Sequence, residues 1–250
     1  MSVLTLRLAG PLQSWGSSAR FSRRTTDSAP TKSGVVGLLA AALGRPRDGD
    51  LSDLAALRFG VRIDQPGTRI RDFQTAHHDD TGKSMPVSER FYLADAVFVA
   101  GLEGDEDLLV HLLAAVRNPV FLPFLGRRSC PPSRNIDLGL HPGAELAATL
   151  AAHEWQASDW YCRRRRKDES VDLTVLLETG PGDDGAEGPG DAVRDQPISF
   201  DPRHRRYGLR GVVARTVTVP NPRADRRNER AALASHDPVG HLTPLDRNGA

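Results

Sequence analysis

Hydrophobic and polar residues alternate over the first nine positions and then change to helical spacing after a polar stretch. The segment from Val3 to Ala9 alternates and predicts a strand. Beyond Lys32 and Ser33, the run GVVGLLAAALG repeats its large apolar residues at helical spacing, and it ends at Gly44. The chain is therefore predicted to begin as a strand, a loop and a helix.

The same pattern predicts further extended segments and a second helix. Leu57 to Asp64 is typical of a strand, Arg69 to Gln74 continues it after a turn, and Arg90 to Glu103 is a third extended region. Asp105 to Asn118 predicts an amphipathic helix with acidic residues in its first turn. The order is strand, helix, strand, strand, helix. A fourth strand would complete the ferredoxin-like βαββαβ arrangement.

The C-terminal half is predicted to add a short helix and more strands. Residues 119–125 are apolar but interrupted by proline. The sequences VDLTVLLE and RGVVARTVTV predict strands at 171–178 and 210–219. Residues 143–155 predict a short helix. The segment from Gly180 to Pro197 is rich in glycine, proline and acidic residues, which indicates a mobile surface loop. A polar tail follows from Pro220.

Composition places the chain among ordinary folded proteins. It has 250 residues, of which 39% are hydrophobic and 26% charged. It has no apolar run long enough to cross a bilayer, and its first ten residues lack the features of a signal peptide, so we expect a cytoplasmic protein with no membrane partner. Two cysteines are too few for a disulfide framework or a thiolate zinc site, and we expect no metal and no cofactor.

The near-neutral charge balance hides segregation along the chain. Residues 1–60 carry a formal charge of +4 and residues 202–230 carry +7, whereas residues 180–196 carry −4. Only three of the 33 basic residues are lysines. Arginine binds phosphate through its planar fork and stacks on bases. Local basic patches for nucleic acid are therefore predicted, although the base composition of the genome explains the preference for arginine equally well.

Catalytic motifs are scarce. The sequence has no P-loop, GxSxG, HExxH or GxGxxG. His77-His78-Asp79-Asp80 is the one cluster that looks like metal ligands, but adjacent residues of an extended loop point in opposite directions, so a solvated loop is favoured. His204 with Tyr207 can act in RNA cleavage as a general base and its helper, and a basic strand end is the alternative.

Candidate binding groups lie in loops and at a helix start. Gly126-Arg127-Arg128-Ser129 combines close backbone approach with two guanidinium groups, or is a charged loop. Lys32 and Ser33 would hold an anion at a helix start, or Ser33 is only an N-cap. Trp15 would stack on a base or lie in the core. The basic run 163–167 suits phosphates without base preference, or is a solvated face.

Four of these segments together resemble one family. They are LRLAGPLQSWG at 6–16, PTKSGVVGLLAAALG at 30–44, RDFQTAH at 71–77 and FLGRRSCPPS at 124–133. They resemble the CasD family, the subunits of the type I-E CRISPR Cascade complex that hold the 5′ handle of the crRNA. The match continues weakly through the last predicted strand.

The resemblance implies a fold and a division of the chain. The fold class is α+β: a ferredoxin-like, RRM-like βαββαβ domain with a protruding thumb and extra C-terminal strands. The expected core spans residues 1–135 and includes a thumb at 74–89. Residues 136–219 form a C-terminal extension of helix and strands that completes the sheet, and residues 220–250 form the polar tail.

The resemblance also implies a noncatalytic role: binding and capping the 5′ handle, and contacting the Cascade backbone subunit and the large PAM-recognising subunit, with target DNA present in the assembled complex. Because the RNP1 pattern of common RRMs is absent, loops and helix starts are favoured over the sheet face. The expected RNA-binding residues are Trp15, Arg23, Arg24, Lys32, Ser33, Gly126, Arg127, Arg128 and Ser129. The expected partner contacts of the thumb are Gln74, His77, His78, Lys83 and Met85.

Two alternatives remain at this point. The first is a metal-independent endoribonuclease that cuts CRISPR precursor RNA, which requires Lys32, His204 and Tyr207 to meet in space. The second is an RNA-binding module outside CRISPR systems, whose gene would lack Cascade neighbours.

Overall fold

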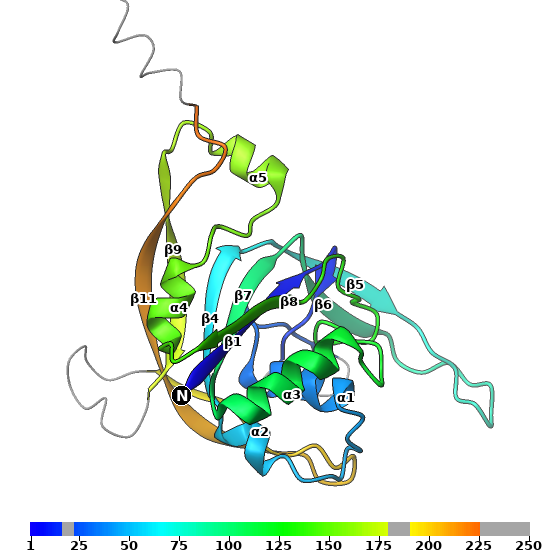
Figure 1. The fold of residues 1–250 in the computed structure, drawn as a ribbon. Helices are drawn as coiled ribbons and strands as arrows, with labels where there is room; N and C mark the ends of the chain where they lie inside the picture. The colour runs from blue at the N-terminus through cyan, green and yellow to red at the C-terminus, as the bar shows by residue number, and fades with distance from the viewer. Residues whose placement is uncertain (17–22, 180–190, 226–250) are drawn as a thin grey trace, which may run out of the picture.

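A computed structural model describes residues 1–16, 23–179 and 191–225 (Figure 1). Residues 180–190 of the predicted acidic loop and residues 226–250 of the predicted tail lie outside this range. Seven strands form one antiparallel sheet in the order β10-β11-β9-β4-β7-β1-β8. Their bounds are β1 Ser2–Ala9, β4 Arg58–Gln65, β7 Val97–Gly104, β8 Asp137–Pro142, β9 Ser170–Glu178, β10 Asp191–Ser199 and β11 Arg206–Pro220.

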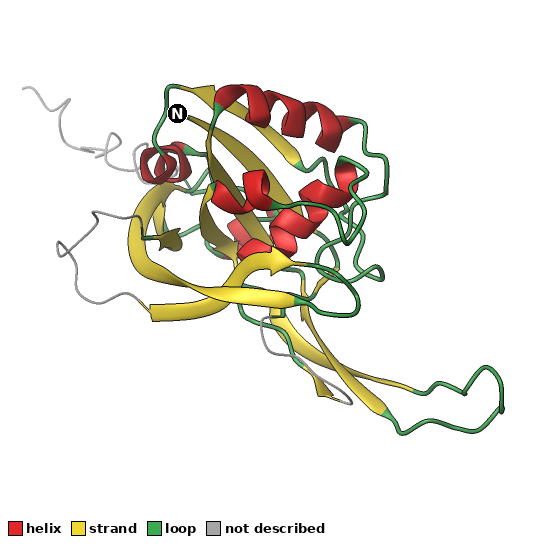
Figure 2. Ribbon diagram, turned by 90° about the horizontal axis from the view of Figure 1, so that it is seen from below, coloured by secondary structure: helices red, strands yellow, loops and turns green. Residues whose placement is uncertain are grey.

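A second, smaller sheet contains β2 (Leu12–Gln13), β3 (Arg23–Arg24), β5 (Thr68–Gln74) and β6 (Ser88–Ala94). β5 and β6 pair antiparallel, whereas β3 joins β6 in the parallel sense. Figure 2 shows that the segment joining β5 to β6 projects away from the rest of the molecule. The chain therefore changes sheets at the turn between β4 and β5.

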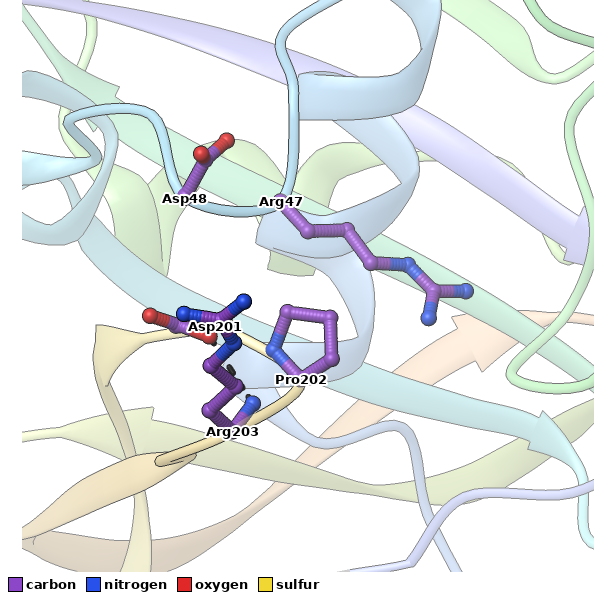
Figure 3. Close-up of a pocket in the computed structure, with 5 residues that line it drawn as sticks. All are labelled: Arg47, Asp48, Asp201, Pro202 and Arg203. Atoms are coloured by element: carbon purple, nitrogen blue, oxygen red, sulfur yellow. Dashed lines mark hydrogen bonds between the residues drawn. The ribbon is translucent and has the colours of Figure 1, made fainter.

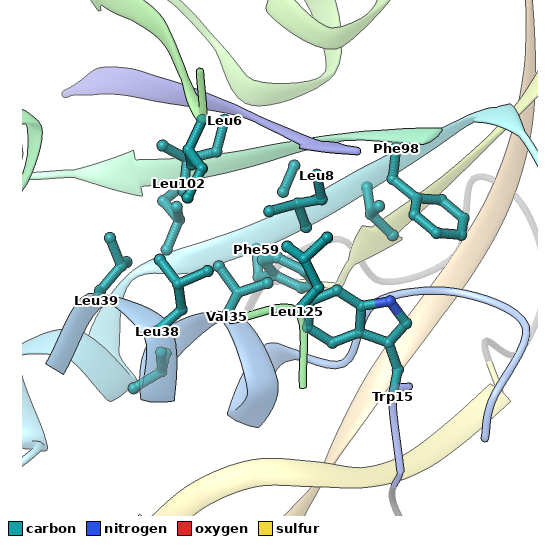
Figure 4. Close-up of a cluster of buried hydrophobic side chains, with 14 of the residues drawn as sticks. Leu6, Leu8, Trp15, Val35, Leu38, Leu39, Phe59, Phe98, Leu102 and Leu125 are labelled. Carbon is teal, nitrogen blue, oxygen red and sulfur yellow. The ribbon is translucent and has the colours of Figure 1, made fainter. Parts of the chain in front are cut away.

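Helices cover both faces of the large sheet. α1 (Lys32–Ala42) and α3 (Glu106–Arg117) pack with Leu4, Leu6 and Leu8 of β1 in the main core, which Figure 4 shows in part. α4 (Leu146–Ala152) packs on the other face. Alternate residues of β1 thus enter different cores, and all eight residues of β7 are buried, as expected of a strand covered on both sides. The remaining helices are α2 (Ser52–Ala56) and α5 (Asp159–Arg164).

Side chains placed at the helix starts explain where α1 and α3 begin. Thr31 Oγ1 accepts a hydrogen bond from the Gly34 N–H at 3.2 Å. Asp105 Oδ1 accepts one from the Leu108 N–H at 3.1 Å. Each oxygen satisfies a backbone donor that has no partner inside the helix. Within the described ranges, no helix is long and apolar enough to cross a membrane.

Most predicted elements are confirmed, with differences in both halves of the chain. The predicted third extended region, 90–103, is two strands in different sheets, β6 and β7, and β5 does not continue β4 but pairs with β6 in the small sheet. The apolar residues 119–125 form no strand, and the next strand along the chain is β8, which pairs with β1. The prediction of a loop up to Pro197 is wrong from Asp191 onward, because β10 pairs with β11 there. The start of the polar tail is also ordered: buried Asn221 donates from Nδ2 to the carbonyl oxygens of Arg165 and Asp168.

Candidate nucleic-acid interface

The small sheet presents arginine and phenylalanine side chains on one face. The register pairs Arg71 with Phe91, Phe73 with Glu89, and Arg23 with Glu89. Paired residues of neighbouring strands point to the same side of a sheet. These five residues, which we call the arginine–phenylalanine face, therefore project together.

The contacts within this face place one guanidinium over each aromatic ring. Glu89 lies 3.9 Å from Arg23 and 3.3 Å from Arg71, measured between side-chain nitrogen and oxygen. The guanidinium of Arg23 lies 5.4 Å from the centroid of the Phe91 ring, and that of Arg71 lies 4.7 Å from the centroid of Phe73. One carboxylate shared by two guanidiniums leaves the face positive. Phe73 is 56% exposed and is available for stacking.

More arginines lie on or beside the small sheet. Arg24, Arg69 and Arg128 are exposed. Arg90 is partly buried, and its buried Nε has no hydrogen-bond partner among the described residues. The Arg69 side chain donates to the carbonyl oxygen of Thr26 at 3.1 Å. None of these four arginines forms an ion pair with a carboxylate of the described residues. Their charge remains available to a phosphate backbone.

Arg127 links the predicted glycine-rich loop to the small sheet. Its guanidinium donates to the carbonyl oxygens of Phe91 and Arg24, at 3.2 and 2.9 Å, and lies 4.8 Å from the centroid of the Tyr92 ring. These contacts fix the loop against β3 and β6. Phosphate binding by Arg127 stays a prediction, as it does for the exposed Arg128 and Ser129.

The predicted role of Gly126 needs correction. Its φ is +84°, and a Cβ at this position would lie 1.8 Å from the carbonyl oxygen of Ser14. The neighbouring Leu125 carbonyl accepts a hydrogen bond from the Ser14 N–H at 3.1 Å. Gly126 thus allows close approach of another segment of the same chain, not of a ligand.

Trp15 is a core residue, so its predicted stacking on a base is wrong. Its side chain is 0% exposed and lies among the buried residues shown in Figure 4. Its Nε1 donates to Gln13 Oε1 at 3.0 Å, and Gln13 Nε2 donates to the carbonyl oxygens of Leu8 and Ala96. A Cβ on Gly34 would lie 2.8 Å from the Trp15 ring, so the glycine of α1 makes room for it. The tryptophan is fully packed and its donor is satisfied.

Lys32 and Ser33 are buried as well, which corrects their predicted role in binding an RNA phosphate. Lys32 is 1% exposed, and its Nζ lies 2.9 Å from Glu178 Oε1. Its backbone N–H, at the start of α1, donates to Asp195 Oδ2 at 2.7 Å. A carboxylate of β10 therefore already occupies the anion-binding end of this helix. Burial lowers the pKa of Lys32, and the hydrogen bond and charge of Glu178 oppose that shift.

The same network ties the C-terminal strands to the rest of the fold. Arg210 donates to both oxygens of Asp195, at 2.6 and 2.9 Å, and its guanidinium lies 5.3 Å from the centroid of the Phe59 ring. Glu178 also accepts the Phe59 N–H at 3.0 Å. We call Lys32, Glu178, Asp195 and Arg210 the buried ion network. It joins α1 to β9, β10 and β11.

A second buried ion pair lies on the opposite face of the large sheet, beside the end of α4. Arg62 and Asp64, both with side chains 0% exposed, pair at 2.8 Å. Arg62 also donates to the carbonyl oxygens of Leu150 and His153, each at 2.7 Å, where α4 ends. Burial raises the pKa of Asp64, and Arg62 opposes the shift. This pair positions α4, and neither of its side chains is exposed.

The projecting segment between β5 and β6 holds the five predicted partner contacts. His77 and Ser84 form a bridge, and the Met85 N–H donates to the Ala76 carbonyl at 2.8 Å. Gln74 lies at the end of β5, and His77, His78, Lys83 and Met85 are exposed. The segment is therefore a backbone-paired arm that presents its side chains outward. Whether these residues contact a partner stays a prediction.

The residues proposed for a nuclease are not assembled around Lys32. Its ammonium is held by Glu178, inside the buried ion network. Tyr207 packs against Phe200, with ring centroids 6.3 Å apart, and His204 is exposed in the turn before β11. No contact of Lys32 with His204 or Tyr207 occurs in the hydrogen bonds and ion pairs of the described residues.

Sequence reasoning missed Arg69, Arg71, Phe73, Glu89 and Phe91 as members of an interface. A signal was present, because Arg69, Arg71 and Phe73 alternate along one predicted strand and share a face of it. Within the sequence, residues 71–77 stand out only as part of a family motif. Loops and helix starts were favoured instead, and the structure shows that Trp15, Lys32 and Ser33 are internal.

Comparison with protein families decides the family. The model of the family described as CRISPR-associated protein (Cas_Cas5) matches residues 3–213. The chain belongs to the Cas5 family. CasD, a subunit of the CRISPR system Cascade from Escherichia coli K12, is 38% identical over 181 residues, which cover 64% of this chain and 80% of that protein. The predicted resemblance is confirmed.

Solved structures agree with the assignment to the Cas5 family. A chain of a CRISPR RNA-guided surveillance complex is 28% identical with a TM-score of 0.70, and the match covers 92% of this chain and 98% of the other. A crystal structure of a Cas protein is 40% identical with a TM-score of 0.64, covering 89% and 97%. The similarity therefore extends through both sheets of this Cas5 protein.

Proposed function

We propose that this Cas5 protein is a noncatalytic subunit of a CRISPR Cascade surveillance complex that binds and caps the 5′ handle of the crRNA. The arginine–phenylalanine face is the observation that carries the proposal. It is open and positive, and it exposes Phe73 under a guanidinium. The likeness to CasD and to a chain of an RNA-guided complex supports the same role.

The chemistry of the face fits single-stranded RNA. Splayed nucleotides are held by stacking on aromatic rings and on guanidinium planes, while arginines neutralise phosphates. Phe73 provides the ring that Trp15 cannot, and Arg69 provides unpaired charge on the same face of β5. Arg24, which pairs with Arg90 in the register, and Arg128 provide unpaired charge elsewhere on and beside the small sheet. In this proposal Phe73 stacks on a handle base, and the arginines fix the path of the strand.

The arrangement of strands supports the finer assignment of the fold. β4, β7, β1 and β8 lie side by side, with α1 joining β1 to β4 and α3 lying between β7 and β8 along the chain. This is the order of a ferredoxin-like βαββαβ unit, followed by β9 to β11 as an extension of the sheet. The proposal includes the division of the chain into residues 1–135, 136–219 and 220–250. Across the first boundary, β8 pairs with β1 and β9 pairs with β4.

The projecting arm supports a role in assembly. In the proposal it is the thumb, residues 74–89, and it contacts the backbone subunit. Exposed Met85 and Val87, 50% and 51% accessible, offer apolar contact area beside His77, His78 and Lys83. The large PAM-recognising subunit is the second protein partner, and target DNA is met within the assembled complex. The proposal includes a cytoplasmic location.

Binding of handle RNA tests the proposal most directly. The double variant Arg71→Ala, Phe73→Ala removes one guanidinium and one exposed ring. The matched control, Trp160→Ala with Arg163→Ala, removes the same two kinds of exposed side chain from α5. With the backbone subunit present, we expect about 10-fold or greater weakening of handle binding for the first variant only, because stacking on one base contributes about 1–3 kcal/mol. Equal weakening by both variants, or by neither, contradicts the proposal.

The noncatalytic part needs its own measurement. Full repeat RNA is incubated with the protein in EDTA and resolved on a denaturing gel, while a native gel reports binding. We expect intact RNA that shifts on the native gel, because Lys32 is held by Glu178 and is not exposed. A discrete cut that His204→Ala or Tyr207→Phe abolishes would favour the endoribonuclease instead.

A further inference from the structure

A group of exposed arginines far along the chain from the small sheet also lacks carboxylate partners. Many arginines of the described residues are paired, such as Arg62 with Asp64, Arg117 with Asp137 and Arg210 with Asp195. The turn between β10 and β11 departs from this pattern. Four exposed arginines there form no ion pair with a described carboxylate. They are Arg203 and Arg205 in the turn, Arg206 at the first position of β11, and Arg47 in the segment that follows α1. We call these four residues the arginine tip.

Two segments meet at the arginine tip around an open pocket of about 380 Å³. Figure 3 shows Arg47 and Asp48 on one side and Asp201, Pro202 and Arg203 on the other. The tip is therefore built from parts of the chain more than 150 residues apart in sequence. A strand lying along this pocket can meet guanidiniums from both segments.

The turn that carries the arginines is held in place. Asp201 Oδ1 accepts the Arg203 N–H at 2.8 Å, and the Asp201 carbonyl accepts the His204 N–H at 3.0 Å. Phe200 packs with the main core and with the ring of Tyr207. Ordering this turn on binding therefore costs little, because its backbone is already fixed.

The charges at the tip favour a polyanion. Arg47 and Arg203 line the pocket together with two carboxylates, Asp48 and Asp201, and Asp201 already accepts a backbone hydrogen bond. Arg205 and Arg206, which are also exposed, follow directly along the chain and give the tip its excess of positive charge. Residues 201–206 contain no large hydrophobic residue; the nearest exposed ones, Ile198 and Leu209, lie on β10 and β11. Tyr207 is packed against Phe200, so the tip offers no exposed ring for a base.

We propose that the arginine tip binds the phosphodiester backbone of a nucleic acid strand without regard to sequence, as a second contact separate from the arginine–phenylalanine face. Arginines hold backbone phosphates through charge and bidentate hydrogen bonds, and such contacts place a strand but do not read bases. The proposal does not depend on which RNA the small sheet holds. It extends the nucleic-acid surface to the C-terminal strands.

The test compares charge removal at two places. Arg203→Ala, Arg205→Ala, Arg206→Ala removes three unpaired arginines. The control, Arg163→Ala, Arg165→Ala, Arg166→Ala, removes the same charge at and just beyond α5, where each arginine pairs with an aspartate. Binding of unrelated single-stranded RNA, single-stranded DNA and duplex DNA is measured by fluorescence anisotropy across a salt series. Comparison of the three affinities shows which kind of nucleic acid the tip prefers.

We expect the tip variant to bind about 10-fold more weakly at low salt and to lose about 2 from the slope of log K against log salt on single strands, since each phosphate contact contributes about 0.7. The control variant should keep its slope. A tip variant with an unchanged slope on all three probes overturns the proposal. So does an equal loss in both variants, because that reports only net charge.

Three further measurements separate the possible causes. The variant Arg203→Lys, Arg205→Lys, Arg206→Lys keeps the charge and should restore most of the slope, whereas a misfolded turn would not be restored. The melting temperatures of all variants check the fold. Arg71→Ala, Phe73→Ala should weaken handle RNA far more than unrelated strands, while the tip variant should weaken them equally. The two proposals can therefore fail separately.

Discussion

Replacing Asp195 with alanine should destabilise the protein strongly, although this residue lies in a segment whose composition indicates a loop. Asp195 is 1% exposed and accepts three hydrogen bonds, two from Arg210 and one from the Lys32 N–H. Its removal leaves the guanidinium of Arg210, whose side chain is 9% exposed, without its carboxylate. It also leaves a backbone donor of α1 unpaired.

The magnitude follows from these lost partners. Breaking a buried ion pair by removing one member costs about 3–5 kcal/mol, because the remaining charge stays desolvated. The unpaired helix N–H alone is worth about 1 kcal/mol, and we count it within that range. The double variant Asp195→Ala, Arg210→Met removes both charges, so it should cost less than the sum of the single variants by about 2 kcal/mol.

Urea denaturation followed by circular dichroism measures these changes as shifts in the free energy of unfolding. Asp195→Asn serves as the milder variant, because its amide oxygen can still accept the Lys32 N–H while the charge is lost. Arg194→Ala, at an exposed position on the same strand, is the control and should change stability by less than about 0.5 kcal/mol. A cost below about 1 kcal/mol for Asp195→Ala, or additive costs in the cycle, would refute the reasoning.

Three other predictions test the packing of the fold. Gly126→Ala should cost more than about 2 kcal/mol in urea denaturation, whereas Gly82→Ala, also at positive φ but with open space at its Cβ, should cost about 1 kcal/mol. Trp15→Ala should cost about 3–5 kcal/mol, and stability unchanged in the same assay would remove Trp15 from the core. Burial, aided by the charge of His141, lowers the pKa of His153 to about 4. Because His153 binds a proton less readily in the folded protein than in the unfolded chain, its contribution to the free energy of unfolding is present above about pH 6.5. That contribution falls by about 1–2 kcal/mol as the pH drops towards 4. The variant His153→Gln should flatten this part of the profile of stability against pH.

The predictions of β1, α1, β4 and α3 agree with the structure because each depends on local pattern. β1 alternates, α3 carries acids at its start, and both patterns are complete within one segment. Position 195 shows the limit of this reasoning. An aspartate in a run of glycine, proline and acid indicates exposure, yet Arg210, 15 residues later, pairs with it and makes it internal.

The candidate interface was harder to predict for a related reason. Trp15, Lys32 and Gly126 have the residue types of an RNA-binding site, but they meet their partners inside the protein: Gln13, Glu178 and Ser14. A tryptophan, a lysine at a helix start or a flexible glycine serves either purpose, and residue type alone does not distinguish them. Only their partners do.

By itself, the sequence determined the alternation of strands and helices, the excess of arginine over lysine and the resemblance to the CasD family. The tertiary structure decided which of those arginines are paired, which aromatic ring is exposed and which strands share a sheet. Arg71, Phe73 and Glu89 form one surface because β5 pairs with β6 in a particular register. Burial and ion pairing depend on contacts between residues distant along the chain, and local pattern carries no information about those distances.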